Sequence, residues 1–83
     1  MISFEESAFH AYLQWAAEDR KIFSKINSLV KAILREPFRG EGKPEPLKGN
    51  LAGYWSRRIN QEHRLVYRVF PDRIVITSCK NHY

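Results

Sequence analysis

The sequence has little of what secreted domains and most cofactor enzymes depend on. Its 83 residues include one cysteine, Cys79, so an internal disulfide is excluded and a reducing cytoplasm is the expected compartment. No cysteines and histidines have zinc spacing, and the four glycines form no phosphate-binding loop, so we expect neither a metal nor a cofactor. A charged-then-apolar leader and an apolar run of about 18 residues are also missing, so we expect no membrane insertion and no export.

The composition that remains is typical of one small folded domain, which we expect to span residues 1–83. Hydrophobic residues make up 43% of the chain and aromatic residues 13%, which argues against disorder. A chain of this length buries only about 64% of the surface that its unfolded form exposes. A second subunit that covered more apolar surface would therefore stabilise the fold.

Positive charge is concentrated in the second half of the chain. Lys and Arg number 14 against 9 Asp and Glu, which gives a formal net charge of +5. Residues 1–42 carry six basic and six acidic side chains, whereas residues 43–83 carry eight basic and three acidic ones. A polyanion such as nucleic acid is the natural partner of the second half, although a basic small domain can also simply be soluble.

Apolar spacing predicts a short strand and two helices in the first half. Residues 2–4 alternate as in a strand, although Ser3 and Glu6 have the spacing of a helix capping box. The acidic pair 18–19 suits the start of a second helix, and Pro37 ends it, so the two helices should form an antiparallel pair. The predicted buried stripes are Phe9, Tyr12, Leu13 and Ala16 in the first helix, and Ile22, Ile26, Leu29, Val30 and Ile33 in the second.

The second half predicts a long loop followed by a three-stranded meander. All four glycines and three of the four prolines lie between Pro37 and Gly53, and a loop of this length is more often functional than incidental. Period-two patterns then predict antiparallel strands over Tyr54–Ile59, Arg64–Phe70 and Ile74–Cys79, the last in a central position. The expected fold class is α+β, with two N-terminal helices on one face of a mainly antiparallel sheet. The other face should be concave, lined by arginines and open to solvent.

Three reactive residue types occur together in the second half. Glu45 lies in the loop, Arg64 and Arg68 lie on the exposed sheet face, and His82 stands near the chain end. A carboxylate, an imidazole and guanidinium groups can cleave RNA without a metal: one group deprotonates the ribose 2′-OH, another protonates the leaving 5′-oxygen, and arginines stabilise the phosphorane. Glu45 also fits a solvated loop carboxylate and His82 a disordered end, so ribonuclease and nucleic-acid binder both remain open.

Other polar residues have simpler interpretations. Arg57 and Arg58 are adjacent, so in a strand their side chains point to opposite faces and at most one of them can face the site that contains Arg64. The alternation of side chains favours Arg58 for the site and a structural role for Arg57. His10 and His63 are interpreted as surface residues. Cys79, on a strand expected to be buried, is interpreted as an inert small hydrophobe.

Four segments together resemble the YoeB (Txe) toxins of the RelE superfamily. They are Lys43–Leu51, Gly53–Ile59, Glu62–Tyr67 and the terminal pair 82–83. The resemblance covers nearly the whole chain and implies a RelE-like fold. It also implies a ribosome-dependent endoribonuclease that cuts mRNA in the decoding site, as the toxin of a type II toxin–antitoxin pair. The implied partners are a YefM-type antitoxin, the ribosome with mRNA, operator DNA together with the antitoxin, and a second copy of the chain.

The resemblance also assigns roles to residues. Glu45 matches the family's general base, His82 its general acid, and Arg64 the arginine that stabilises the phosphorane. The expected products are a 2′,3′-cyclic phosphate and a 5′-hydroxyl. The rival interpretation is a non-catalytic basic module that occupies the ribosome or, with its antitoxin, operator DNA. The remaining matches are Arg58, a second phosphate-contacting arginine, Lys48, a basic residue beside the site, and Tyr83, a tyrosine that shapes it.

Overall fold

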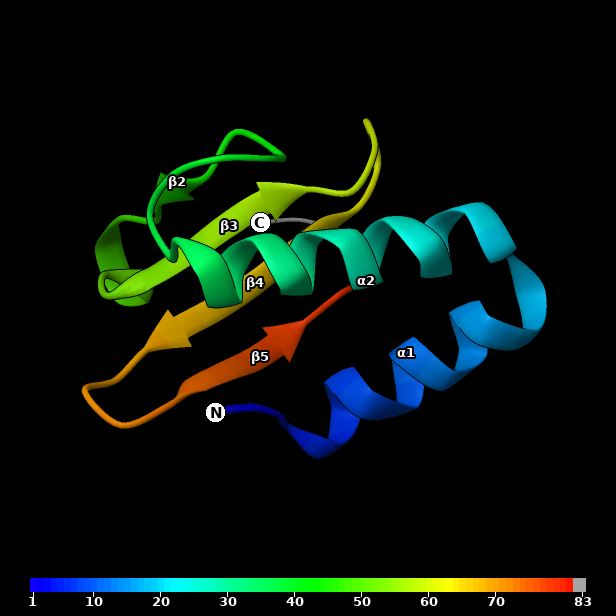
Figure 1. The fold of residues 1–83 in the computed structure, drawn as a ribbon, viewed down its shortest axis with the longest axis horizontal. Helices are drawn as coiled ribbons and strands as arrows, with labels where there is room; N and C mark the ends of the chain where they lie inside the picture. Colours follow the sequence, from blue (N-terminus) through cyan, green and yellow to red (C-terminus); the bar gives the residue numbers. More distant parts are fainter. Residues whose placement is uncertain (82–83) are drawn as a thin grey trace.

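The computed structural model describes residues 1–81, which form two helices packed on one face of a five-stranded sheet (Figure 1). The elements in chain order are β1 (Ile2–Phe4), α1 (Glu6–Glu18), α2 (Arg20–Arg35), β2 (Glu45–Pro46), the 3₁₀ turn η1 (Gly49–Leu51), β3 (Tyr54–Arg58), β4 (Arg64–Val69) and β5 (Ile74–Ser78). The predicted α+β class is confirmed. Each meander strand ends one residue earlier than predicted, where the turn or tail begins.

The sheet has the strand order β1-β5-β4-β3-β2. Strands β3, β4 and β5 form the predicted antiparallel meander, while β1 pairs parallel to β5 with Ile2 opposite Ile74. The interior position of β5 agrees with its apolar character on both faces. Strand β2 adds a short edge beside β3, so Glu45, predicted in a loop, lies in a strand. Pro46 is compatible with this position because a proline, which has no N–H to donate, is tolerated in an edge strand.

Helix α2 forms as its sequence predicts. Asp19 is its N-cap and accepts hydrogen bonds through Oδ1 from the backbone N–H groups of Lys21 and Ile22, at 3.1 and 3.2 Å. The helix ends at Arg35 because Pro37 forces the preceding residue out of helical geometry. Its stripe of Ile26, Leu29 and Ile33 is fully buried against the sheet.

Helix α1 buries only part of the predicted stripe: Tyr12 packs against the core, as predicted. Phe9 and Leu13 are 44% and 51% exposed, whereas Ala8 is buried and Trp15 packs against the core. An alanine at the contact lets the helix approach the end of β5 closely, which the bulkier Phe9 would prevent. The capping-box alternative is also wrong: Ser3 lies in β1, and Glu5 occupies the N-cap position, where no described side chain caps the helix.

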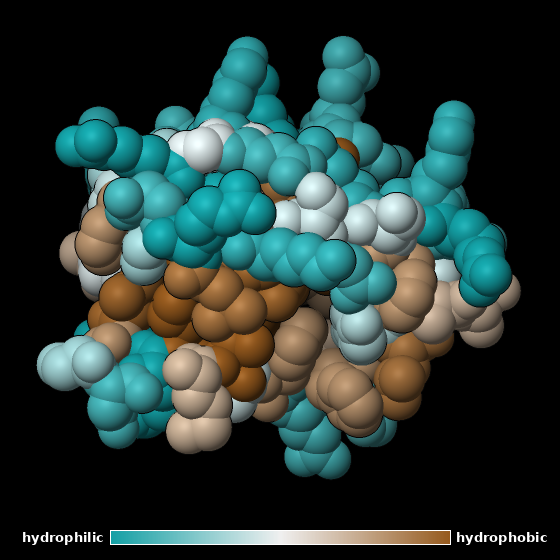
Figure 2. Space-filling model, in the orientation of Figure 1, coloured by the Kyte–Doolittle hydropathy of each residue, from teal (hydrophilic) through white to brown (hydrophobic). Residues whose placement is uncertain are grey.

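The two helices form an antiparallel pair in front of the sheet (Figure 1). On this side of the molecule hydrophobic side chains gather below α2, over β5 and the N-terminal end, and hydrophilic side chains line the upper rim (Figure 2). Leu34, on the outer side of α2, is 52% exposed. In the described part of the chain, neither helix has the length and apolar character that crossing a membrane requires.

Candidate active site on the open face of the sheet

Strand register brings three of the predicted site residues to the sheet face that the helices leave open. Glu45 lies opposite Ser56 across β2 and β3, and Arg58 lies opposite Arg64 across β3 and β4. Ser56 and Arg58 are two positions apart on one strand, so both pairs point to the same side, in rows about 7 Å apart. A carboxylate and two guanidinium groups therefore share one surface, as predicted.

The open face is less polar than expected. Glu45 and Arg58 are exposed and Arg64 is half-buried, but Ser56 and Val66 between them are 6% and 2% exposed. The prediction of a solvent-open row of arginines is therefore correct at the edges of this face and wrong at its centre. A buried floor with charged groups around it excludes water from one side of any ligand, which strengthens electrostatic contacts there.

Arg58 and Arg64 line a basic cleft of about 660 Å³ between α2 and the turn that joins β3 to β4. Lys25 and Lys43 add two cations, and the backbone around Asn60 forms the outer wall. Lys25 is neutralised by Glu41, whose Oε2 lies 2.7 Å from its Nζ. None of the ion pairs within residues 1–81 involves Arg58, Arg64 or Lys43, so the cleft keeps positive charge for an anion.

The guanidinium group of Arg64 is fixed by the turn next to it. Its Nη1 donates to three backbone carbonyls, those of Asn60, Gln61 and His63, at 2.7, 3.3 and 3.2 Å. The remaining N–H groups are available to a phosphate, because a guanidinium has five donors. Such pre-orientation lowers the entropy cost of binding an anion at this position.

The last described residue, Asn81, is hydrogen-bonded to the start of β4. The backbone N–H of Arg64 donates to the carbonyl of Asn81, and the N–H of Asn81 donates to Nδ1 of His63, both at 2.8 Å. His82 and Tyr83, the predicted general acid and the terminal tyrosine, lie outside the described residues, and their roles stay predictions.

Lys48 is not part of the cleft. It is exposed and precedes η1, beyond the end of β2. The structure therefore groups Arg58 with Arg64, places Glu45 on the same face in the neighbouring row, and leaves Lys48 beyond the edge strand.

The interpretation of His63 as a surface residue is wrong. It is 6% exposed, and its ring lies edge-to-face against Trp15, with ring centroids 4.9 Å apart. Asn60 accepts hydrogen bonds from the N–H groups of Glu62 and His63, which bends the turn and directs the histidine inward. Asn60 could have indicated the turn, because Asn is a common turn residue, but the burial of His63 depends on Trp15, which is distant in the sequence.

A second basic group lies at the other end of the open face. The guanidinium of Arg68 stacks between the rings of Tyr54 and Phe70, at 5.2 and 5.1 Å from their centroids, and Arg73 stacks on Phe70 at 4.5 Å. Tyr54 lies opposite Arg68 in the sheet register. The sequence placed Arg68 on the exposed sheet face but did not indicate its aromatic partners, because cross-strand pairing cannot be derived from a single strand.

The Cys79 thiol, buried directly after β5, is not a candidate nucleophile. Burial raises the pKa of the Cys79 thiol to about 11, so it stays protonated and is a poor nucleophile, as predicted. A group of three His, Cys, Asp or Glu residues that could hold a metal does not occur within residues 1–81.

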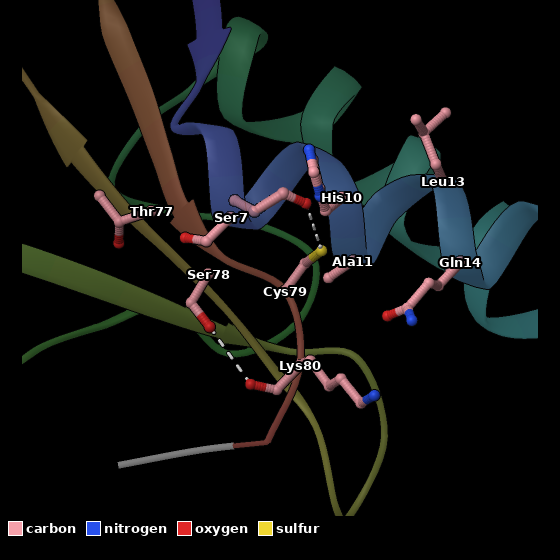
Figure 3. A pocket seen from close by; sticks show the side chains of 10 residues that line it. Ser7, His10, Ala11, Leu13, Gln14, Thr77, Ser78, Cys79 and Lys80 are labelled. Carbon is pink, nitrogen blue, oxygen red and sulfur yellow. Dashed lines mark hydrogen bonds between the residues drawn. The ribbon is translucent and has the colours of Figure 1, made fainter.

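A separate cleft of about 580 Å³ lies between α1 and the end of β5, and it contains none of the predicted site residues (Figure 3).

Comparisons with known proteins assign the chain to a family. Residues 4–83 match a model described as the YoeB-like toxin of bacterial type II toxin–antitoxin systems. The toxin YoeB of Synechocystis sp. is 56% identical over 82 residues, which are 99% of this chain and 95% of that protein.

Solved structures agree with this match. A YoeB/ParE toxin from Agrobacterium tumefaciens has a TM-score of 0.96 and 46% identity, covering 99% of this chain and 98% of that one. A heterotetrameric YoeB–YefM toxin–antitoxin complex from Staphylococcus aureus has a TM-score of 0.92 and 52% identity, covering 100% and 97%. A YoeB dimer from the same organism has a TM-score of 0.92 and 53% identity, covering 99% and 95%. With the family match extending over nearly all of the sequence and the fold shared end to end, this chain belongs to the YoeB-like toxins of bacterial type II toxin–antitoxin systems.

Proposed function

We propose that this toxin is a ribosome-dependent endoribonuclease that cleaves mRNA in the decoding site and so inhibits translation. The observation that carries the proposal is the register that brings Glu45, Arg58 and Arg64 to one sheet face. The hydrogen bond between Arg64 and Asn81 adds support, because His82 is the next residue in the sequence.

The reaction needs no metal, because ribose supplies the nucleophile. Glu45 removes the proton from the 2′-OH, and the 2′-oxygen attacks the adjacent phosphorus. Arg64 and Arg58 stabilise the phosphorane, and His82 protonates the 5′-oxygen as its bond to phosphorus breaks. The products are a 2′,3′-cyclic phosphate and a 5′-hydroxyl. Lys48 and Tyr83 contact the RNA beside the scissile link.

Dependence on the ribosome follows from what the toxin alone does not supply. Glu45 is an exposed side chain on a two-residue edge strand, so the protein does little to orient its carboxylate toward a 2′-OH. A ribosome that holds the message with the 2′-oxygen in line with the leaving oxygen supplies that orientation, which is worth roughly 7–11 kcal/mol. Free RNA should therefore be a poor substrate.

The proposed partners follow from the family. A YefM-type antitoxin neutralises the toxin, as the YoeB–YefM complex from S. aureus suggests. The proposed pair also binds operator DNA. A second copy of the chain completes a homodimer, as in the S. aureus YoeB dimer. The small core of an 83-residue chain is consistent with stabilisation by either partner.

Primer extension on a message translated by purified ribosomes tests the proposal. The wild-type toxin should create new RNA ends that carry a 2′,3′-cyclic phosphate, and His82→Ala should lose cleavage while it still binds ribosomes. Ribosome binding by the wild type without new RNA ends would instead support the non-catalytic module. Equal cutting of naked RNA and ribosome-bound message would refute the dependence on the ribosome.

A further inference from the structure

His63 is buried where the chain approaches its C-terminal end. Its imidazole is held by Trp15 of α1 on one side and, through the backbone, by the Asn60 turn on the other. A histidine that is 6% exposed and fixed in this way cannot turn its ring toward solvent. Of its two ring nitrogens, Nδ1 has a hydrogen-bond partner in the main chain.

The partner of Nδ1 determines the protonation state of the ring. The backbone N–H of Asn81 points at Nδ1 from 2.8 Å, and a backbone N–H can only donate. Nδ1 therefore carries no proton, and the ring proton is on Nε2, which lies 3.7 Å from Oε1 of Glu62. The neutral imidazole acts here as a hydrogen-bond acceptor for the main chain.

Asn81 is held on both sides as a result. Its N–H donates to His63, and its carbonyl accepts from the N–H of Arg64 at 2.8 Å. Its φ of +62° is in the left-handed region, which asparagine adopts more readily than most residues other than glycine. The contact with His63 stabilises the bend at this residue.

The segment before Asn81 is fixed from α1. Nε1 of Trp15 donates to the carbonyl of Cys79 at 2.9 Å, and Sγ of Cys79 donates to the carbonyl of Ala8 at 3.4 Å. Figure 3 shows this segment passing beside α1, with Cys79 turned toward the helix. Because its start is fixed in this way, the direction of the chain at residue 81 depends on the His63 contact.

We infer that His63 is a positioning residue: its Nδ1 fixes the backbone of Asn81 beside Arg64 and so sets the point from which the chain continues to His82. The inference rests on the proposed ribonuclease activity, because only His82 chemistry makes the position of residue 81 matter for turnover. The main-chain carbonyl of His63 also holds the guanidinium of Arg64, and substitutions of the side chain leave that bond in place.

Two variants separate the acceptor from the ring. His63→Phe keeps the aromatic contact with Trp15 but has no acceptor, whereas His63→Asn loses the ring but keeps an acceptor, Oδ1, as many bonds from the backbone as Nδ1. In His63→Phe, exchange of the Asn81 amide with solvent should be about tenfold faster or more. The kcat for ribosome-bound message should fall by a similar factor, with KM nearly unchanged. His63→Asn should restore both quantities to within about threefold of wild type, and His10→Phe, at an exposed histidine of α1, is the matched control.

A measurement on the wild type guards against a variant that does not fold. NMR should detect a scalar coupling across the hydrogen bond from the Asn81 amide to an unprotonated Nδ1 of His63. Absence of this coupling, unchanged kcat in a His63→Phe variant with rapid Asn81 exchange, or an Asn variant no better than Phe would each overturn the inference. A wild-type toxin that shows the coupling but cuts no message would instead refute the proposed ribonuclease and, with it, the effect on turnover.

Discussion

Two adjacent arginines of β3 show how differently the two faces of the sheet use the same side chain. Arg57 points to the helices and is fully buried, whereas Arg58 points to the open face and is exposed. The guanidinium of Arg57 donates to the carbonyls of Glu36, Arg39 and Glu41 at 2.7–3.0 Å and to the hydroxyl of Tyr67 at 3.0 Å.

Arg57 therefore stabilises the fold, whereas Arg58 remains available to bind a ligand. Arg57 ties the loop after α2 to the sheet, and Gly42 packs so closely against it that an added Cβ would lie 3.1 Å from the Cβ of Arg57 and 2.8 Å from Cδ2 of Leu29. Burial raises the pKa of Tyr67, so its hydroxyl stays neutral and donates to the carbonyl of Pro37 at 2.7 Å. The open face keeps its cations for a ligand instead. A substitution on one face should therefore change stability, and one on the other should change activity.

The largest effect is expected for Arg57→Met. The variant keeps most of the volume of the side chain but leaves four acceptors without their donor. At about 1 kcal/mol for each lost hydrogen bond, the expected loss is about 4 kcal/mol. Urea unfolding should show a loss of this size, which is a large part of the stability of a small domain. An unchanged unfolding midpoint would mean that the loop is held by other contacts.

The next effect concerns the opposite face. Arg64→Lys keeps the positive charge but loses the planar fork, so ribosome binding should persist while turnover falls about 10²-fold, or ~2.7 kcal/mol of transition-state stabilisation. The melting temperature should change little. The matched control is Arg35→Lys, at an exposed arginine in the last turn of α2, which packs on the other face of the sheet. Full activity in Arg64→Lys would reduce Arg64 to a source of electrostatic potential.

The separation of the two arginines could be predicted from the sequence, because side chains alternate along a strand and the period of β3 is clear. The strands of the meander and α2 were predictable for the same reason. The orientation of α1 was not, since Phe9 and Leu13 satisfy the helical period but the close approach to β5 favours Ala8. Burial against a partner element is a tertiary property that the period of one helix does not contain.

The candidate site was predictable only as a set of residue types. Sequence parity favoured Arg58 over Arg57, but the strand position of Glu45 depends on pairing between β2 and β3, across a segment whose prolines indicated a loop. The burial of His63 depends on Trp15, which lies 48 positions earlier in the numbering, so no local pattern indicated it. Contacts distant in the sequence decided both cases.

A smaller effect on activity is expected at the far end of the open face. Arg68→Ala removes the cation between Tyr54 and Phe70 but leaves the cleft of Arg58 and Arg64 intact. If RNA extends across this face, KM should rise a few-fold, kcat should stay unchanged, and the slope of log affinity against log salt should decrease by about one. Titrations at several salt concentrations measure this directly, and an unchanged slope would confine RNA to the other end.

The smallest effect is expected at Glu41, whose backbone contacts the buried Arg57 and whose side chain makes a separate, partly exposed set of contacts. Its backbone carbonyl accepts from buried Arg57, whereas its side chain, about a third exposed, bonds Lys25 and Ser28 at 2.7 Å. The hydrogen bond from Lys25, then that from Ser28, lowers the pKa of Glu41 below its ordinary value of 4.5. Glu41→Gln changes only the side-chain contacts, and at neutral pH it should cost about 0.5 kcal/mol, the value of an exposed ion pair.

The pH dependence of this difference identifies its origin. A carboxylate whose pKa is lowered by folding stabilises the protein above its unfolded pKa, and the contribution is lost as the pH falls through the lower, folded pKa. The unfolding free energies of wild type and Glu41→Gln should therefore differ at neutral pH and converge in acid, below the folded pKa of Glu41. A difference that persisted in acid would show that Gln disturbs the backbone contact with Arg57. The side chain of Glu41 would then help to hold the loop that Arg57 ties to the sheet.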